Sequence, residues 1–146
     1  MAVGRRELLL AGGGVICAHA LGCGSDNPIV LPQEIPAGNV SDLTAVGTFI
    51  VVSSAPVSIA RDGNGIYAMS LVCTHQGCAI PESPGGSANF NRIHCGCHGS
   101  EYNGQGMVIL PPSTRPLDHL EVTADPTGAL TIHGQVVVPA SQRLQA

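Results

Sequence analysis

Cysteine and histidine residues crowd into two short stretches of the sequence. The first stretch, LVCTHQGCAI, spans residues 71–80, and the second, HCGCHGSEY, spans residues 94–102. The side chains of interest are Cys73, His75, Cys78, Cys95, Cys97 and His98. Residues of these types at this spacing have four alternative uses: two disulfides, a zinc site, an iron–sulfur cluster or a nucleophilic thiol.

Three of the four uses leave part of this pattern unexplained. A nucleophilic thiol needs one activated cysteine and a nearby base, not four cysteines with two histidines. Two disulfides suit an exported protein and allow three pairings, but they leave both histidines at ligand spacing by chance. Zinc accepts two cysteines with two histidines, yet it would leave Cys78 and Cys97 without a role, and a Cys-x-His spacing is unusual for it.

The use that employs all the residues resembles the Rieske [2Fe–2S] proteins. In that family two cysteines bind one iron and two histidines bind the other, from two facing loops. The resemblance implies one [2Fe–2S] cluster per chain, with Cys73 and Cys95 on one iron and His75 and His98 on the other. The similarity extends over roughly residues 57–134 and is specific in the two loops.

A further cysteine accompanies each ligand pair, and CTHQGC with CGCHGS resembles the branch found in cytochrome bc and b6f complexes. In that branch the additional cysteines join the cluster loops, which implies a disulfide between Cys78 and Cys97. The resemblance also implies that Ser100 donates a hydrogen bond to a cluster sulfide and Tyr102 to a cysteine sulfur. Such donors stabilise the more negative reduced state and raise the reduction potential.

The ligand set itself favours a high reduction potential. Two ferric ions, two sulfides and two thiolates are neutral together, because neutral imidazoles add no charge. Reduction therefore takes this site from neutral to singly negative, whereas a cluster with four cysteines would start doubly negative. Adding an electron to a neutral site in a low-dielectric pocket is easier, so we expect a high-potential centre.

Two more features lie near the expected cluster. Residues 110–117, LPPSTRPL, resemble the proline-containing loop that closes over the cluster in this family, and proline suits a rigid lid. Gln76 stands where quinol-oxidising relatives usually carry leucine, beside the exposed histidine ligands. A polar side chain there changes the docking surface, which weighs against quinol oxidation more than against electron transfer.

Residues 1–23 are typical of an export signal rather than of a folded element. Paired arginines precede an apolar, glycine-rich run of 15 residues, which is shorter than the about 20 residues of a membrane span. We therefore expect a twin-arginine-type signal. Its end has three alternatives: cleavage at the small-x-small site AHA, lipidation of Cys23 in the lipobox-like ALGC, or retention as a short anchor.

The rest of the chain indicates a linker and one all-β domain. Residues 24–40 hold three prolines and no periodicity, which favours a linker or an extended arm. Residues 41–146 show short apolar runs separated by turns, including two expected hairpins that turn at DGNG and DPTG. We expect a small, multi-stranded antiparallel Rieske-type domain, with the two cluster-binding loops where strands end.

Composition limits the core and the partners. The chain has 146 residues, only 3% aromatic and 11% charged, so its core is built from small aliphatic side chains and needs a covalent or metal staple. All six basic residues are arginines and the formal net charge is −4. Without a basic patch, nucleic acid is not an expected partner.

The resemblance and the export signal together imply one-electron transfer by an exported protein on the periplasmic side, membrane-tethered if Cys23 carries lipid or the signal is retained. We expect an electron-transfer protein or the small subunit of a periplasmic oxidoreductase, rather than a stand-alone enzyme. Its redox partner would be a cytochrome, an oxidoreductase large subunit or a quinol. The alternatives are the Rieske subunit of a quinol-oxidising cytochrome bc-type complex and, in another class, a zinc- or disulfide-stapled binding module.

Overall fold

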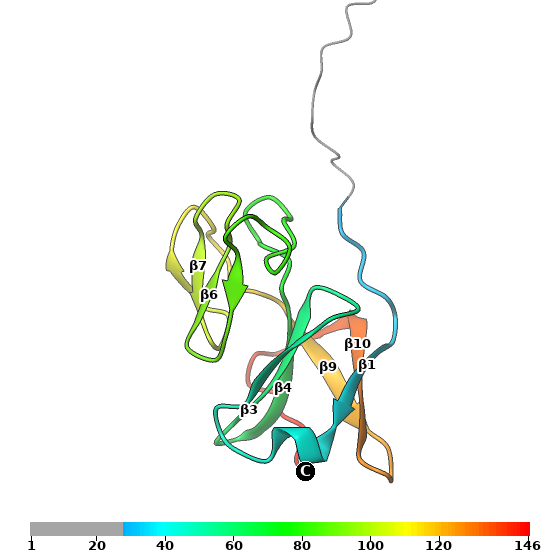
Figure 1. Cartoon of the computed structure of the whole chain (residues 1–146). Helices are drawn as coiled ribbons and strands as arrows, with labels where there is room; N and C mark the ends of the chain where they lie inside the picture. Colours follow the sequence, from blue (N-terminus) through cyan, green and yellow to red (C-terminus); the bar gives the residue numbers. More distant parts are fainter. Residues whose placement is uncertain (1–27) are drawn as a thin grey trace, which may run out of the picture.

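Two antiparallel sheets make up residues 28–146, the part of the chain that the computed structural model describes (Figure 1). The large sheet has six strands in the order β1-β10-β9-β4-β3-β2, and the small sheet has four in the order β5-β6-β7-β8. The strands are β1 (Ile35–Asn39), β2 (Phe49–Val52), β3 (Val57–Asp62), β4 (Gly65–Ser70), β5 (Ser87–Ala88), β6 (Arg92–His94), β7 (Glu101–Asn103), β8 (Val108–Leu110), β9 (His119–Ala124) and β10 (Ala129–Val138), and a 3-10 helix, η1 (Val40–Leu43), follows β1. The predicted all-β antiparallel class is confirmed.

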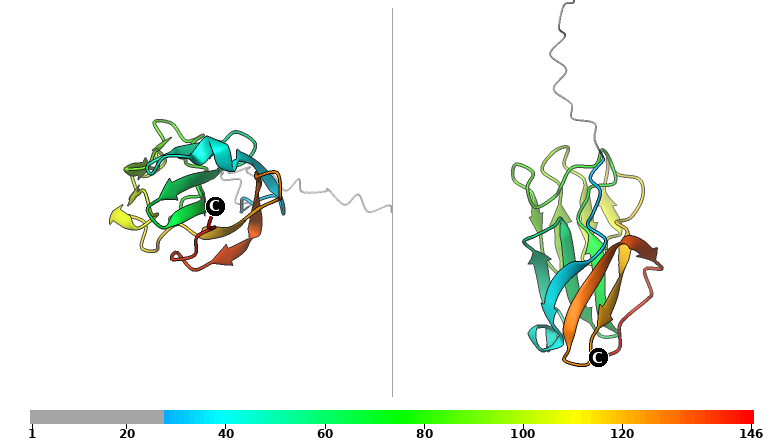
Figure 2. Two further views of the ribbon diagram at one scale, coloured as in Figure 1. Left: turned by 90° about the horizontal axis from the view of Figure 1, so that it is seen from below. Right: turned by 90° about the vertical axis from the view of Figure 1, so that its right-hand side faces the viewer.

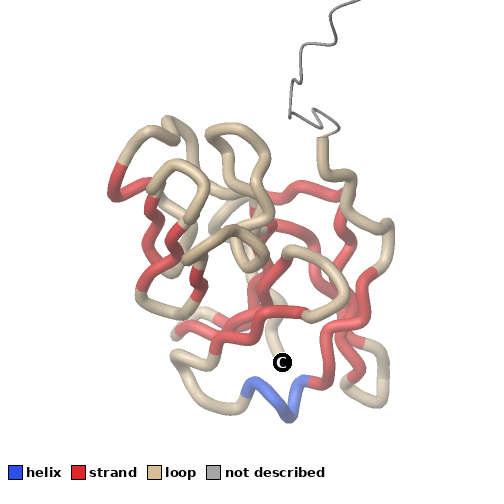
Figure 3. Tube along the Cα trace, turned by 45° about the horizontal axis from the view of Figure 1, so that its top comes forward, coloured by secondary structure: helices blue, strands red, loops and turns tan. Residues whose placement is uncertain are grey.

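The small sheet is an insertion between two paired strands of the large sheet. The chain leaves the large sheet after β4, forms β5 to β8, and returns at β9, which pairs with β4 at Ala68↔Leu120. The longest loops, residues 71–86 and 111–118, connect the small sheet to the large sheet, and loops make up much of this part of the domain (Figure 3). The first described segment of the chain, drawn in blue, starts at the end of the domain opposite the C-terminus (Figure 2).

Both predicted hairpins are present. β3 and β4 pair through Asp62↔Gly65, which leaves Gly63 and Asn64 as a two-residue loop. β9 and β10 are joined by a turn in which Gly128 has a φ of +86°, a left-handed conformation that favours glycine. Two further apolar runs, TFIVVSS at residues 48–54 and NFNRIHC at residues 89–95, contain the strands β2 and β6.

The segment predicted as a linker contributes a strand. β1 falls within residues 24–40, where it pairs with β10 through Ile35↔Ile132. Ile35 and Ala37, two positions apart, are 2% and 6% exposed, so one face of this strand is buried. Prolines do not prevent this, because β1 is an edge strand and does not need every N–H for the sheet. The folded domain therefore begins before Ser41.

Two apolar cores lie in the domain. The core of the large sheet is aliphatic, as the composition predicts, and includes Leu31, Ile35, Leu43, Val57, Ile59, Ile66, Leu120, Leu130 and Ile132. The second core lies beneath the long loops and includes Tyr67, Met69, Leu71, Ile80, Ile93, Tyr102 and Leu117, together with Cys73 and Cys95. Two of the predicted iron ligands are thus part of a hydrophobic core.

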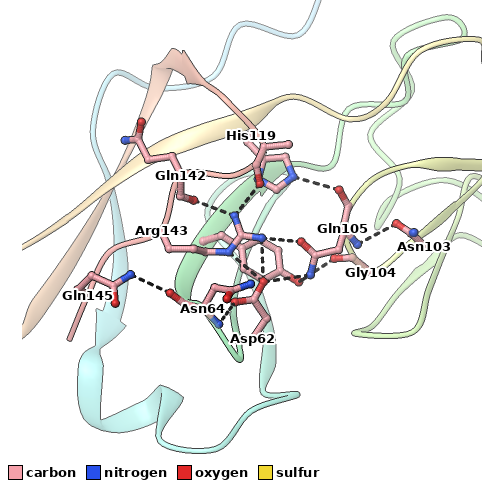
Figure 4. Close-up of polar contacts among 11 residues, drawn as sticks. Asp62, Asn64, Asn103, Gly104, Gln105, His119, Gln142, Arg143 and Gln145 are labelled. Atoms are coloured by element: carbon pink, nitrogen blue, oxygen red, sulfur yellow. Dashed lines mark hydrogen bonds and ion pairs between the residues drawn. The ribbon is translucent and has the colours of Figure 1, made fainter.

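A buried polar cluster ties the small sheet to the large sheet and to the C-terminal tail (Figure 4). Arg143 Nη2 donates to Asp62 Oδ2 at 2.8 Å and to Gln105 Oε1 at 2.7 Å. Gln105 belongs to the turn between β7 and β8, whereas Asp62 ends β3. The Arg143 guanidinium also lies 4.4 Å from the centre of the Tyr67 ring. Three distant segments therefore meet at one arginine.

Residues 28–146 contain no helix that is long and apolar enough to cross a membrane. The predicted export signal and the lipobox-like sequence at Cys23 lie outside these described residues.

Candidate metal centre

The two predicted cluster loops are hairpin ends with matching backbone hydrogen bonds. In each loop the N–H of the first cysteine donates to the carbonyl five residues later, at 2.8 Å for Cys73 and 2.9 Å for Cys95. In each, a glycine N–H donates back to that cysteine's carbonyl, Gly77 at 2.8 Å and Gly99 at 2.9 Å. Both glycines have positive φ, +77° and +81°, which other residues rarely adopt. The two loops therefore present their first cysteine in the same way.

The four predicted ligands contribute two buried thiols and two adjacent rings. Cys73 and Cys95 are free cysteines that are 2% and 0% exposed. The rings of His75 and His98 lie with their centroids 4.8 Å apart and nearly perpendicular, at 83°. His98 is exposed, while His75 is half-buried. The same two loops thus supply two buried thiols and two imidazoles that are nearer the surface.

One unpaired atom indicates what such a site would hold. His75 Nδ1 is buried and has no hydrogen-bond partner among residues 28–146. Buried polar atoms without partners are rare because they lose their interactions with water. A neutral imidazole nitrogen is a common metal ligand, and Cys73 and Cys95 offer two thiolates. The donor set therefore fits a [2Fe–2S] cluster with mixed cysteine and histidine ligation.

Cys78 and Cys97 form a disulfide, which confirms the predicted pairing. The bond joins the two loops across a sequence separation of 19 residues. The sulfurs of Cys78, Cys95 and Cys97 lie within 4.8 Å of one another. Disulfide sulfurs carry no thiolate charge, so this trio is not itself a metal site and only Cys95 remains available as a ligand.

Tyr102 and Ser100 occupy different positions relative to the thiols. The Tyr102 hydroxyl lies 3.3 Å from Cys73 Sγ, which is the kind of contact expected of the predicted donor. Ser100 is fully buried, and its Oγ accepts a hydrogen bond from the Ser113 N–H at 3.0 Å. The donation of a hydrogen bond from Ser100 to a sulfide remains a prediction.

Two hydroxyl residues near the site were not predicted from the sequence. Ser113, in the proline-containing loop, has its Oγ 2.5 Å from Tyr102 Oη and 3.6 Å from Cys73 Sγ. Thr74 Oγ1 donates to the carbonyl of Arg115 at 2.7 Å and lies 3.1 Å from Tyr102 Oη. The sequence signal for Ser113 was its position directly after a proline pair, in a loop expected to close over the cluster. In the structure this Pro–Pro bond is cis.

The pKa values of the two free thiols shift in opposite directions. Burial by itself would raise the pKa of Cys73, but hydrogen bonds from Tyr102, from the N–H of His75 and from Ser113 outweigh it and lower the pKa. Burial raises the pKa of Cys95, and the neighbouring Cys73 sulfur raises it further. Cys73 is therefore the more readily ionised of the two thiols. The thiolate is the form that binds metal, so Cys73 is the better prepared ligand.

An antiparallel all-β domain with paired Cys and His residues on two disulfide-linked loops defines the class of this protein. Residues 26–123 match the Rieske [2Fe–2S] domain family, and the chain belongs to that family. Its cofactor is a [2Fe–2S] cluster, and the loop disulfide agrees with the predicted cytochrome bc and b6f branch.

Known relatives support this assignment. The chain is 36% identical over 123 residues to the cytochrome b6-f complex iron-sulfur subunit of Synechococcus elongatus, covering 79% of this chain and 61% of that protein. It is 33% identical to the iron-sulfur subunit 2 of the same complex in Synechocystis, with the same coverage. The chain thus spans about three fifths of the length of these relatives. A solved quaternary ammonium Rieske monooxygenase shares the fold with a TM-score of 0.51 at 20% identity, over 70% of this chain and 31% of that one.

Proposed function

We propose that this chain transfers single electrons through a high-potential Rieske [2Fe–2S] cluster bound by Cys73 and Cys95 on one iron and by His75 and His98 on the other. The observation that carries the proposal is that two loops supply two buried free thiols together with two adjacent histidine rings, one of which is exposed. A site of this shape keeps one side of a redox centre dry and brings the other side to the surface, where a partner can dock.

The cluster supplies a one-electron couple when it is bound. Burial of Cys73 and Cys95 in the second core keeps water away from the thiolates. The Tyr102 hydroxyl donates toward Cys73 Sγ and stabilises the added negative charge. His98, which is exposed, would bring the histidine side of the site to the surface, within reach of a redox partner.

The N-terminal sequence supports an exported, periplasmic location for this carrier. Paired arginines before a short apolar run are typical of twin-arginine export, which carries folded proteins and so allows the cluster to be inserted first. The disulfide Cys78–Cys97 also suits an oxidising compartment. The partner would be a cytochrome or the large subunit of an oxidoreductase.

A second candidate is the Rieske subunit of a quinol-oxidising complex. The similarity to cytochrome b6-f iron-sulfur subunits and the loop disulfide favour it. Gln76 weighs against it, because this exposed polar side chain stands next to the predicted ligand His75 where quinol-oxidising relatives usually carry leucine. Stopped-flow mixing of the oxidised protein with a quinol distinguishes the two: rapid reduction supports the second candidate, and a lack of reduction supports the first.

Potentiometric titration of the purified protein tests the proposal directly. We expect a one-electron couple between about −150 and +300 mV, the range of Rieske centres. A protein that contains zinc and shows no redox couple would overturn the proposal in favour of a stapled binding module. A couple near about −400 mV would instead indicate a cluster with four cysteine ligands.

A further inference from the structure

Ser113 lies at the centre of a buried set of hydroxyl groups. It is 3% exposed, and its Oγ contacts three polar atoms: Tyr102 Oη at 2.5 Å, Ser100 Oγ at 3.0 Å and Cys73 Sγ at 3.6 Å. Its N–H also donates to Ser100 Oγ at 3.0 Å. Ser113 therefore connects the proline-containing loop to both groups that the sequence predicts as donors to the cluster.

Counting protons shows why Ser113 matters to Tyr102. A thiolate at Cys73 has no proton and only accepts hydrogen bonds, and Tyr102 has a single proton to give. Three acceptors compete for that proton: Cys73 Sγ at 3.3 Å, Thr74 Oγ1 at 3.1 Å and Ser113 Oγ at 2.5 Å. The nearest competitor is Ser113, so the direction of the Ser113–Tyr102 hydrogen bond decides whether Cys73 receives a proton donor.

The geometry leaves Tyr102 able to accept from Ser113. Its oxygen has two lone pairs, and the Thr74 N–H, which donates to it at 3.2 Å, uses one of them. Thr74 Oγ1 donates its own proton to the carbonyl of Arg115, at 2.7 Å. The Ser113 proton has three acceptors, Tyr102 Oη at 2.5 Å, Ser100 Oγ at 3.0 Å and Cys73 Sγ at 3.6 Å, and the shortest contact, to Tyr102, is the strongest.

We propose that Ser113 is a positioning residue for the redox centre: it donates to Tyr102 Oη and thereby directs the Tyr102 proton to Cys73 Sγ. The inference rests on the proposed function and extends it to a residue of the proline-containing loop. A chain of hydrogen bonds that ends on a charged acceptor strengthens each member through polarisation. Ser113 thus raises the reduction potential through Tyr102, without itself binding iron.

The test is the midpoint potential of the cluster-loaded, full-length protein and of its variants. Ser113→Ala is expected to lower the potential while the EPR signal of the cluster persists. Tyr102→Phe is expected to lower it further, and the double variant should match Tyr102→Phe alone, because Ser113 acts through Tyr102. Thr114→Ala, which removes an exposed hydroxyl from the adjacent position, should leave the potential unchanged.

Each other outcome decides against the proposal. An unchanged potential in Ser113→Ala overturns it, and an additive double variant shows that Ser113 acts on Cys73 without Tyr102. If Ser113→Ala loses the cluster while Thr114→Ala is fully loaded, a matched pair of variants decides between a purely structural role and the proposal. That pair is Ser113→Thr and Ser113→Val, which share a shape and differ by the hydroxyl; equal potentials in the two overturn the proposal. Absence of a Rieske signal from the wild type would instead refute the proposed function itself.

Discussion

Side-chain hydroxyl groups gather around one of the two free thiols and not around the other. Cys73 Sγ is contacted by the hydroxyls of Tyr102 and Ser113, whereas Cys95 is surrounded mainly by the apolar side chains of the second core. Charge on Cys73 is therefore stabilised by hydroxyl groups as well as a backbone N–H, whereas charge on Cys95 is stabilised by the backbone N–H groups of Cys97 and His98. We infer that the reduction potential depends most strongly on the residues around Cys73.

The first residue-scale prediction concerns Tyr102→Phe. Removing its hydroxyl takes away a hydrogen bond to a charged sulfur, and about 1.4 kcal/mol of lost stabilisation of the reduced state corresponds to about 59 mV for a one-electron couple. We expect a decrease of the order of 50 mV, measured by protein-film voltammetry. Tyr67→Phe is the matched control, because the Tyr67 hydroxyl donates to the Gly104 carbonyl at 2.7 Å, away from the thiols. Equal potentials in wild type and Tyr102→Phe would remove the hydrogen-bond role.

The second residue-scale prediction concerns pH and His119. Burial lowers the pKa of His119 below the ordinary value of 6.5, and the nearby Arg143 lowers it further. Its Nδ1 is buried with no hydrogen-bond partner in the described part of the chain, so a proton added there would find no acceptor. The unfolded chain takes up this proton near pH 6.5 while the folded chain does not, so stability falls as the pH drops below about 6.5.

His119→Gln should flatten this pH dependence. Glutamine keeps a donor for the Gln105 carbonyl, which lies 3.0 Å from His119 Nε2, and it does not titrate. Urea unfolding at pH 7.5 and pH 5 measures the loss of stability in both proteins. An equal loss in wild type and variant would show that His119 does not contribute.

At the scale of the elements, the two cluster loops are held together by a covalent bond and the two sheets by a buried ion pair. The disulfide Cys78–Cys97 joins loops that belong to different hairpins. Arg143 of the C-terminal tail bridges Asp62 of the large sheet and Gln105 of the small one (Figure 4). Because the predicted ligands come from both loops, we expect the disulfide and the buried ion pair each to help keep the metal centre assembled.

Replacing both disulfide cysteines tests the first device. Cys78→Ala with Cys97→Ala opens a loop of roughly 20 residues, and the expected loss is about 3 kcal/mol in the free energy of unfolding. Guanidinium unfolding of the cluster-loaded protein measures it. Wild-type protein treated with a thiol reductant is the control and should show the same loss. No change in stability would mean that the loops are held by the cluster and the core alone.

Replacing Arg143 tests the second device. The side chains of Arg143 and Asp62 are 7% and 13% exposed, so Arg143→Met leaves a largely buried carboxylate without its partner. We expect a loss of about 2 kcal/mol, between the values for exposed and for fully buried pairs. Arg115→Met is the control: it breaks the Arg115–Asp118 pair, whose side chains are 59% and 41% exposed, and should cost less than about 1 kcal/mol. Equal losses in the two variants would contradict a special role for the buried pair.

For the whole molecule, the structural features that follow from local sequence patterns were predicted, whereas those that depend on long-range contacts were not. The hairpin around Asp62–Gly65 and the two cluster loops follow from turn residues and ligand spacing within short windows. Residues 24–40 were predicted to be a linker or an extended arm, because their three prolines masked an alternation in β1 that only its pairing with β10 makes evident. Pairings between residues far apart in the chain leave no such local signal.

At the predicted site, too, local features were predicted and long-range contacts were not. The disulfide pairing followed from the family pattern and is confirmed. Ser113 and Thr74 were not predicted, because their contacts depend on how the proline-containing loop folds against the first cluster loop. Arg143 lies far from its partner Asp62 in the sequence, and nothing near it indicates a buried ion pair. Sequence spacing identifies candidate ligands, whereas the surroundings that adjust them come from tertiary structure.

EPR spectroscopy of the dithionite-reduced protein tests most directly the claim that these two loops bind a Rieske [2Fe–2S] cluster. We expect a rhombic [2Fe–2S] signal with a low average g value from the wild type. His98→Ala should abolish the signal, while His133→Ala, which removes a histidine that contacts Thr123 on the large sheet, should retain it. A colourless, EPR-silent wild-type protein that contains zinc, or an unchanged signal in His98→Ala, would contradict the account.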